Sequence, residues 1–189
     1  MITNQLEIIE QGQLYLDTVS NQDYTEVISP HFISSAGSHI RHIIDHYLAI
    51  MSGLKSELIN YDTRKRGVQL ESSPKLAKEK FDEIVIWIQN LCEDELNAMI
   101  MLSTEISVIN KKVQKVQTSI ARELIFAGNH AVHHYAMIAQ ISFAQKSALQ
   151  TTNLPENFGL AAATATFLRE NNELTSDAKN EKKTLAVIN

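Results

Sequence analysis

The apolar positions of this chain recur mostly every three or four residues, which is the spacing of one face of an α-helix. Ser35 is a favourable N-cap before one such stripe, and Pro74 suits the first turn of another. Polar segments rich in small residues separate the stripes. The pattern predicts helices over about 2–20, 35–58, 74–91 and 119–146.

The segment 96–118 follows a different pattern, because its apolar residues alternate with polar ones as they do along a half-buried strand. Asn110 and Lys111 can turn the chain between two such strands. We therefore expect a short β-hairpin between the third and fourth helices. The predicted fold class is all-α, a four-helix bundle with this small β-hairpin insertion.

The chain has 189 residues, of which 44% are hydrophobic, enough for one domain with a real core. We expect a single helical-bundle domain over residues 1–170. The remaining 171–189 are charged and poor in large apolar side chains, which predicts a flexible tail.

Composition narrows the classes of partner. With 17 basic and 22 acidic residues the net charge is -5, which argues against a nucleic-acid partner held by phosphate contacts. No apolar run reaches 18 residues and the N-terminus has no signal-like apolar core, so we expect a cytoplasmic protein without a membrane partner. The single cysteine, Cys92, ends an apolar run and is expected to be a buried structural thiol.

The stretch GNHAVHHYAMI, residues 128–138, holds three of the seven histidines. His130 and His134 are four residues apart, so they share one helix face, which also carries apolar residues. His133 points about 100° away from His134 and is expected on the flank or the surface. No glutamate stands between the pair as it does in H-E-x-x-H, which argues against a zincin-type protease.

Two imidazoles hold a divalent ion poorly, and a third ligand is needed. The second predicted helix offers His39, His42 and His46 on one stripe. His39 and His46 lie closer to its apolar face than His42 does, and helical geometry does not choose among the three. The alternative is that all these histidines are structural and hydrogen-bonded.

Four stretches together resemble the DinB/YfiT-like superfamily of metalloproteins. They cover roughly residues 10–170 and read SSAGSHIRHIIDHYLAI, with H-x-x-D at His42–Asp45, then YDTRKRGVQLE, ARELIFAGNHAVHHYAMI and LPENFGLAAAT. The resemblance implies a four-helix bundle whose metal is held by one histidine from the second helix and two from the last. Carried over by position, these metal ligands are His42, His130 and His134. His39 and His46 depart from the pattern, and either can replace or join His42.

The resemblance also implies a zinc or nickel ion, a homodimer, and a small-molecule substrate with a low-molecular-weight thiol as a candidate. We therefore expect a divalent-metal-dependent enzyme, a thiol-dependent transferase or a small-molecule hydrolase. The alternative is a non-catalytic metal-binding or stress-response bundle.

Elementary chemistry agrees with a catalytic site. Three neutral imidazoles leave the ion its charge and an open position, and such an ion lowers the pKa of bound water to about 7. Asp45 can orient a ligand imidazole or can be a solvated surface acid.

Overall fold

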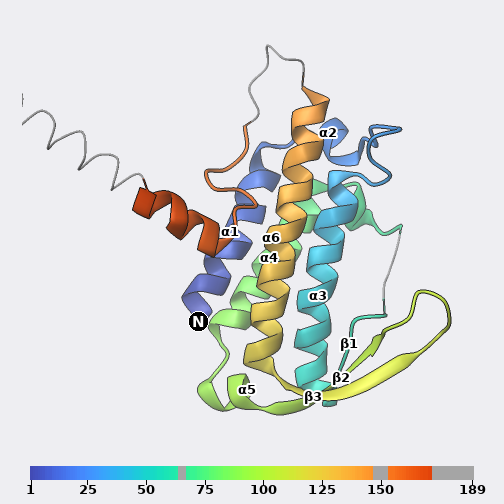
Figure 1. Ribbon diagram of the computed structural model, residues 1–189, viewed down its shortest axis with the longest axis vertical. Helices are drawn as coiled ribbons and strands as arrows, with labels where there is room; N and C mark the ends of the chain where they lie inside the picture. The colour runs from blue at the N-terminus through green and yellow to red at the C-terminus, as the bar shows by residue number, and fades with distance from the viewer. Residues whose placement is uncertain (64–66, 147–152, 172–189) are drawn as a thin grey trace, which may run out of the picture. The chain divides into compact units, whose positions relative to one another are not determined.

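The computed structural model describes residues 1–63, 67–146 and 153–171 (Figure 1). Within the chain two compact units are distinguished, Met1–Gly159 and Leu160–Asn189. In the second unit, the described residues 162–171 are helical. The proposed tail 171–189 lies almost wholly outside the described residues, and the domain limits of 1–170 stay a prediction.

The first unit is built mainly from helices (Figure 1). The four long helices are α1 (Ile2–Thr18), α3 (Ala36–Ser56), α4 (Pro74–Gln89) and α6 (Ile120–Gln145). The short helical segments are α2 (Asn21–Thr25), the 3-10 turn η1 (Gln69–Glu71) and α5 (Glu93–Asn97). The strands are β1 (Leu58–Asn60), β2 (Met99–Glu105) and β3 (Val113–Ser119).

Side-chain capping fixes where three of the long helices begin. Ser35 Oγ accepts from the backbone N–H of Ser38 at 3.2 Å, as its N-cap position predicted. Ser73 and Ser119 cap α4 and α6 in the same way, and Pro74 occupies the first turn of α4. These hydrogen bonds satisfy amide groups that a helix leaves unpaired at its start.

Each long helix packs against two others: α3 against α6 and α4, and α1 against α4 and α6. The core between them is made of isoleucines and of fully buried aromatic side chains, Tyr24, Tyr47, Phe81 and Tyr135. Tyr47 donates its buried hydroxyl to Gln5 Oε1 at 3.3 Å. The predicted four-helix bundle is confirmed, and no helix in the described part of the chain is long and apolar enough to cross a membrane.

The predicted hairpin between α4 and α6 is also present, as β2 paired antiparallel with β3. Its connection spans 106–112 and is longer than the two-residue turn expected at Asn110 and Lys111. A third strand, β1, was not predicted; it pairs parallel with β2, so that the sheet order is β1–β2–β3. Three residues directly after a helix are too few to show a strand pattern.

The expectation for Cys92 is wrong. Cys92 is exposed, not buried, because the chain leaves the core after Leu91 and Cys92 becomes the N-cap residue of α5, where its N–H donates to Glu95. The segment around Phe158 packs against the bundle. Its ring stacks on Tyr15 and Tyr135, at centroid distances of 5.3 and 4.9 Å.

Candidate metal centre

The contact between α3 and α6 brings the two groups of histidines together. His39, His42 and His46 come from α3, and His130 and His134 come from α6. His39 and His46 are buried and His42 is half-buried. This agrees with the helical spacing, which placed His39 and His46 closer to the apolar face of α3 than His42. His133 is exposed, as predicted.

His130 lies at the centre of this cluster. Its Nε2 atom is 3.1 Å from Nε2 of His42 and 3.1 Å from Nε2 of His134. Around a tetrahedral ion with metal–nitrogen bonds of 2.0–2.1 Å, ligand nitrogens lie about 3.3 Å apart. Two of the three nitrogen pairs among the histidines expected to bind metal, His42–His130 and His130–His134, therefore lie at a spacing close to that of ligands.

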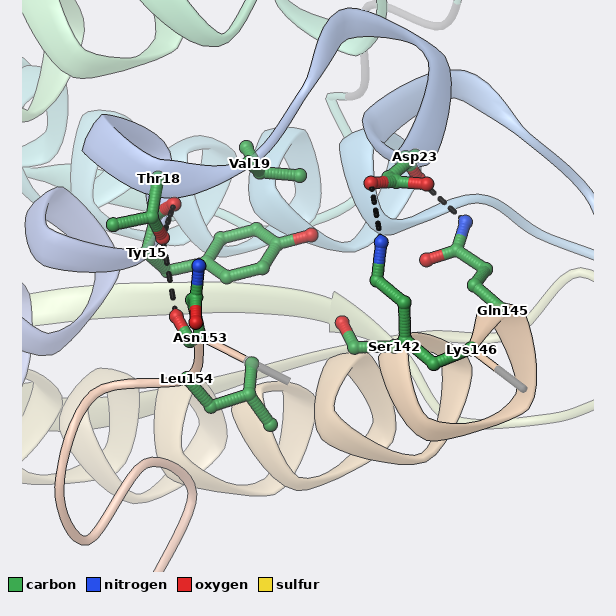
Figure 2. Close-up of a pocket in the computed structure, with 9 residues that line it drawn as sticks. All are labelled: Tyr15, Thr18, Val19, Asp23, Ser142, Gln145, Lys146, Asn153 and Leu154. Carbon is green, nitrogen blue, oxygen red and sulfur yellow. Dashed lines mark hydrogen bonds and ion pairs between the residues drawn. The ribbon is translucent and has the colours of Figure 1, made fainter. Parts of the chain in front are cut away.

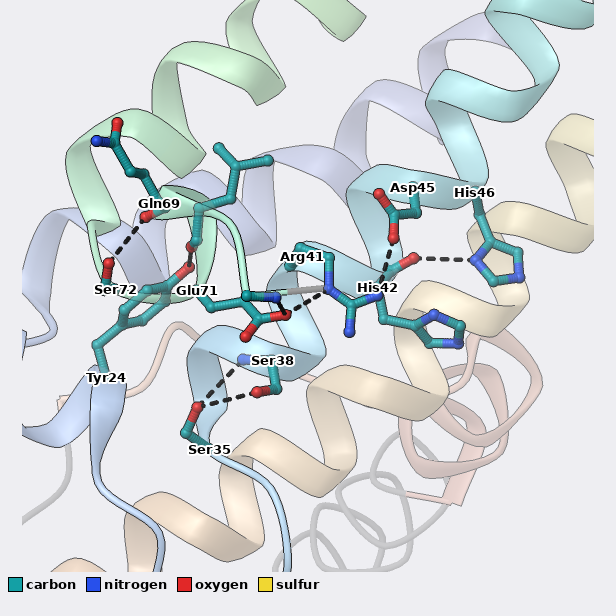
Figure 3. Close-up of polar contacts among 12 residues, drawn as sticks. Tyr24, Ser35, Ser38, Arg41, His42, Asp45, His46, Gln69, Glu71 and Ser72 are labelled. Atoms are coloured by element: carbon teal, nitrogen blue, oxygen red, sulfur yellow. Dashed lines mark hydrogen bonds and ion pairs between the residues drawn. The ribbon is translucent and has the colours of Figure 1, made fainter. Parts of the chain in front are cut away.

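A second set of three histidines shares two members with the first. Ligand atoms of His42, His46 and His130 all lie within 4.8 Å of one another. His46 donates its Nδ1–H to the backbone carbonyl of His42 at 2.9 Å, so its Nε2 is the nitrogen with the lone pair when the ring is neutral (Figure 3). His46 is thus chemically suited to be an additional ligand.

His39 connects His134 to the start of α3. The Nδ1 atoms of His39 and His134 are 2.8 Å apart, and Nε2 of His39 is 2.9 Å from Ser34 Oγ. If His134 presents its Nε2 lone pair to an ion, its Nδ1 carries the proton and donates to His39. His39 then donates from Nε2 to the serine hydroxyl. One set of tautomers thus gives every ring nitrogen of His134 and His39 a partner, with the ion as the partner of His134 Nε2.

The environment of the cluster favours neutral imidazoles. Burial lowers the pKa of His134 to about 3, and the neighbouring His130, His39, His133 and His46 lower it further in that order. Burial also lowers the pKa of His39, with His133 and Arg41 as weaker causes. Metal binding needs deprotonated ring nitrogens, so at neutral pH these two rings require no proton release.

Aromatic rings flank the histidines. Phe126 stacks on His130 with centroids 5.7 Å apart, and Tyr61 stacks on His46 at 4.8 Å. The Tyr61 hydroxyl donates to Glu123 Oε2 at 2.7 Å. Glu123 has no exposed surface and also accepts from Thr118 and Arg122, at 2.6 and 2.7 Å.

Sequence reasoning missed these flanking residues. Phe126 lies four residues before His130, so helical spacing alone was a sufficient signal for it. Tyr61 and Glu123 lie 62 positions apart, and their contact depends on how the end of β1 meets the start of α6.

The Asp45 carboxylate binds Arg41 and not a histidine, so it does not orient an imidazole in this structure. Its Oδ2 accepts from Arg41 Nη1 at 2.8 Å, and Arg41 Nε donates to Glu71 Oε1 at 2.9 Å (Figure 3). Arg41 is buried, and its ion pair with Glu71 ties α3 to η1, whereas its ion pair with Asp45 lies within α3. The carboxylate is thus neutralised by a guanidinium.

A separate cavity of about 110 Å³ lies between the end of α1 and the end of α6 (Figure 2). Lys146 forms an ion pair with Asp23 at 3.1 Å on one side of it, and Thr18 donates to the carbonyl of Asn153 at 3.2 Å on the other. Its lining holds no histidine. These contacts fasten the helix ends.

Comparisons with known proteins bear on the fold. The chain matches no family model. It is 30% identical over 113 residues to FK506-binding protein 5 of Rhizopus delemar, a match that covers 60% of this chain and 28% of that protein. The chain thus spans little more than a quarter of the length of this curated relative, whose name describes the whole protein.

The crystal structure of a DinB-like protein of Bacillus subtilis, YjoA, is similar in fold. The superposition has a TM-score of 0.55 at 15% sequence identity, and it covers 80% of this chain and 95% of that one. This likeness shows architecture and not activity. Together with the packing of the four long helices, it establishes that the chain has the DinB/YfiT-like helical-bundle fold.

Proposed function

We propose that this protein is a divalent-metal-dependent enzyme whose ion is held by His42, His130 and His134. The observation that carries the proposal is the position of His130, with Nε2 at 3.1 Å from the Nε2 atoms of both other histidines. Imidazole ligands suit zinc and nickel, and we take one of these as the ion. The DinB-like fold supports this assignment.

The protein's own residues have separate roles at this site. His39 orients His134 through the Nδ1–Nδ1 hydrogen bond, and the His46 ring and Phe126 flank His130. When bound, the ion supplies Lewis-acid activation of a coordinated water or thiol. Stacked rings beside the histidines keep one side of the site apolar and favour an organic substrate over bulk water.

The proposed reaction class is a thiol-dependent transfer or a hydrolysis on a small molecule. A low-molecular-weight thiol is the proposed co-substrate for the transfer. The resemblance of the histidine motifs to those of DinB/YfiT-like metalloproteins supports this class.

The second candidate function is non-catalytic metal binding. The specific observation in its favour is His46, whose ligand atom lies within 4.8 Å of those of His42 and His130. Four imidazoles would saturate a tetrahedral ion and leave no position for a substrate.

The first experiment measures metal content. Protein stripped with a chelator is titrated with zinc and, separately, nickel, and metal is counted by elemental analysis. We expect a ratio near one ion per chain for wild type and for His133→Ala, the exposed control on the same helix. We expect loss of binding in His130→Ala. A ratio near zero in wild type, unchanged in His134→Ala, would leave structural histidines as the explanation.

The second experiment measures turnover on the metal-loaded protein. A panel of electrophiles with low-molecular-weight thiols, and of esters, amides and epoxides, covers both proposed reaction classes. Turnover that disappears in His130→Ala supports the enzyme. Tight metal binding, a melting temperature that falls sharply on chelation, and no turnover across the panel would support the non-catalytic candidate.

A further inference from the structure

The connection of the β2–β3 hairpin, residues 106–112 and here called the hairpin tip, exposes aliphatic side chains. Val108 is fully exposed, and Ile109 and Ile106 are 86% and 53% exposed. In Figure 1 the hairpin is drawn in yellow and extends sideways, away from the helices, from beside the end of α3. Three aliphatic residues gathered at a projecting loop are uncommon, since scattered single residues are the norm on protein surfaces.

The charge around the hairpin tip is opposite to that of the chain. Lys111, Lys112 and Lys115 are all exposed, and the one acidic residue between Met99 and Ser119 is Glu105, so this segment has more positive than negative charge. The whole chain has a net charge of -5. None of the ion pairs among the described residues involves these lysines. The hairpin thus offers an anionic partner both apolar contacts and unneutralised positive charge.

Three backbone N–H groups of the hairpin tip are hydrogen-bonded within it. Ser107 Oγ accepts from the N–H groups of Ile109 and Asn110, at 3.3 and 3.2 Å. The N–H of Ile106 donates to the carbonyl of Lys112 at 2.9 Å. Each unpaired amide makes it less favourable for a loop to move into a less polar phase. The internal hydrogen bonds remove part of that free-energy cost.

We propose that the hairpin tip docks on an anionic lipid membrane. The aliphatic side chains of Ile106, Val108 and Ile109 enter the boundary between head groups and acyl chains, and the lysines contact acidic head groups. This contact lies on the surface and needs no spanning helix. The proposal is independent of the metal centre and of the function proposed for it.

Two other occupants fit less well. A second copy pairing along the open edge of β3 would bring Lys115 near its own counterpart, and lysines on edge strands are a known means of preventing such pairing. A nucleic acid would leave the exposed aliphatic residues without a partner. Residues 99–119 also contain no arginine and no aromatic side chain on which a base can stack.

The test is flotation of the full chain with vesicles of phosphatidylcholine, alone or with about 30 mol% phosphatidylserine. We expect binding to the anionic vesicles, with an affinity that falls as salt is raised from about 0.05 to about 0.5 M. The double variant Val108→Ser, Ile109→Ser should bind at least about tenfold more weakly. Replacing lysine by glutamine at 111 and 112 should cost about fivefold for each lysine and flatten the salt dependence.

The matched controls are an aliphatic and a lysine exposed elsewhere. Ile33 is 97% exposed and Lys75 is exposed on α4, so Ile33→Ser and Lys75→Gln should bind as wild type does. Hydrogen exchange on the wild-type protein gives a readout without any substitution, because vesicles should slow exchange at 106–112 relative to the rest of β2 and β3. These results together would support the proposal.

Several results would overturn it. One is that the protein does not float with anionic vesicles at low salt. Another is that Ile33→Ser or Lys75→Gln weakens vesicle binding as much as the hairpin-tip variants do. A third is that vesicles leave hydrogen exchange at 106–112 unchanged. A dimer in sedimentation equilibrium that the Val108→Ser, Ile109→Ser variant dissociates, without vesicle binding, would assign the hairpin tip to self-association. Tighter binding to a DNA oligonucleotide than to vesicles would assign it to nucleic acid.

Discussion

The Nδ1 atoms of His39 and His134 lie 2.8 Å apart across the contact between α3 and α6. A hydrogen bond between two such atoms needs one proton, and the ring that donates it keeps its lone pair on Nε2. Nε2 of His134 lies 3.1 Å from Nε2 of His130, whereas Nε2 of His39 lies 2.9 Å from Ser34. Ser34 Oγ can donate or accept, so it fits either tautomer of His39, and an ion on Nε2 of His134 selects the one in which His134 donates to His39.

The first prediction concerns this pair. Replacing His39 by alanine removes the acceptor that holds the His134 ring, and we expect metal affinity to fall by about 10- to 100-fold. Isothermal titration with zinc measures it. His133→Ala, next to His134 but exposed, is the control and should change affinity little. Wild-type affinity in His39→Ala would show that the hydrogen bond does not position the ligand.

The parts of the site that could be predicted from sequence are those set by residues close together along the chain. The spacing of His130 and His134 and the outward direction of His133 follow from helix geometry alone, and the structure agrees with both. That α3 is the helix packed against α6 is a tertiary fact. The choice of His42 over His39 and His46 rested on the resemblance, because helical geometry does not decide which of three histidines on one stripe binds a metal.

The fold shows the same division. Long periodic segments gave the four helices to within about two residues at most ends. The strand β1 and the exposure of Cys92 were missed, because each is decided by what packs nearby. Ile59, the centre of β1, is fully buried against Gly53 of α3, where a Cβ would come within 2.4 Å of the Ile59 side chain. Such a close approach leaves no periodic trace in the sequence.

The second prediction separates the two overlapping sets of histidines. If His42, His130 and His134 are the ligands, His46→Ala should keep a ratio near one ion per chain, and the loss of affinity should be less than about tenfold. The comparison is with His134→Ala, which should lose at least as much binding as His130→Ala. Loss of stoichiometric binding in His46→Ala, with retention in His134→Ala, would assign the ion to His42, His46 and His130 instead.

The third prediction concerns pH. In the folded metal-free protein the pKa of His134 is lowered to about 3, against an ordinary value of 6.5. Between these values the unfolded chain binds more protons than the folded one, so stability is lost as pH falls from about 6.5 toward 3. One such group contributes a slope of at most about 1.4 kcal/mol per pH unit.

Urea unfolding of chelator-treated protein between about pH 7 and pH 5, above the ordinary carboxylate range, measures this slope. His134→Gln cannot take up a proton in this range and should show a shallower fall in the free energy of unfolding. An equal slope in wild type and His134→Gln would mean that this histidine does not cause the acid sensitivity.

The fourth prediction concerns the buried carboxylate of Glu123. Tyr61→Phe removes the hydroxyl that donates to Glu123 Oε2 at 2.7 Å, and a hydrogen bond to a charged, buried group is worth about 1.5–3 kcal/mol. We expect the free energy of unfolding to fall by about 2 kcal/mol. Ile125→Ala, a substitution at a half-exposed position of the same helix, should change it by less. No loss in Tyr61→Phe would mean that the remaining donors, Thr118 and Arg122, satisfy the carboxylate alone.

The last prediction concerns Arg41, which is buried and bonded to Asp45 and Glu71. Removing one partner of a buried ion pair leaves the others uncompensated and commonly costs 3–5 kcal/mol. Because the two acids are partly exposed, at 17% and 23% of their side-chain surface, we expect a smaller loss of about 2 kcal/mol for Arg41→Met. Lys75→Met, which breaks an exposed pair with Glu79, should cost less than about 0.5 kcal/mol.

A double variant decides whether the cost is electrostatic. Adding Glu71→Gln to Arg41→Met removes one of the two stranded charges, so part of the lost stability should return. If the two substitutions simply add, Arg41 stabilises α3 by packing its alkyl chain and not by neutralising the acids. Either result also tests the site, because α3 carries His42 on the turn between Arg41 and Asp45. Zinc affinity should then fall in Arg41→Met only if the ion pairs hold that turn in place.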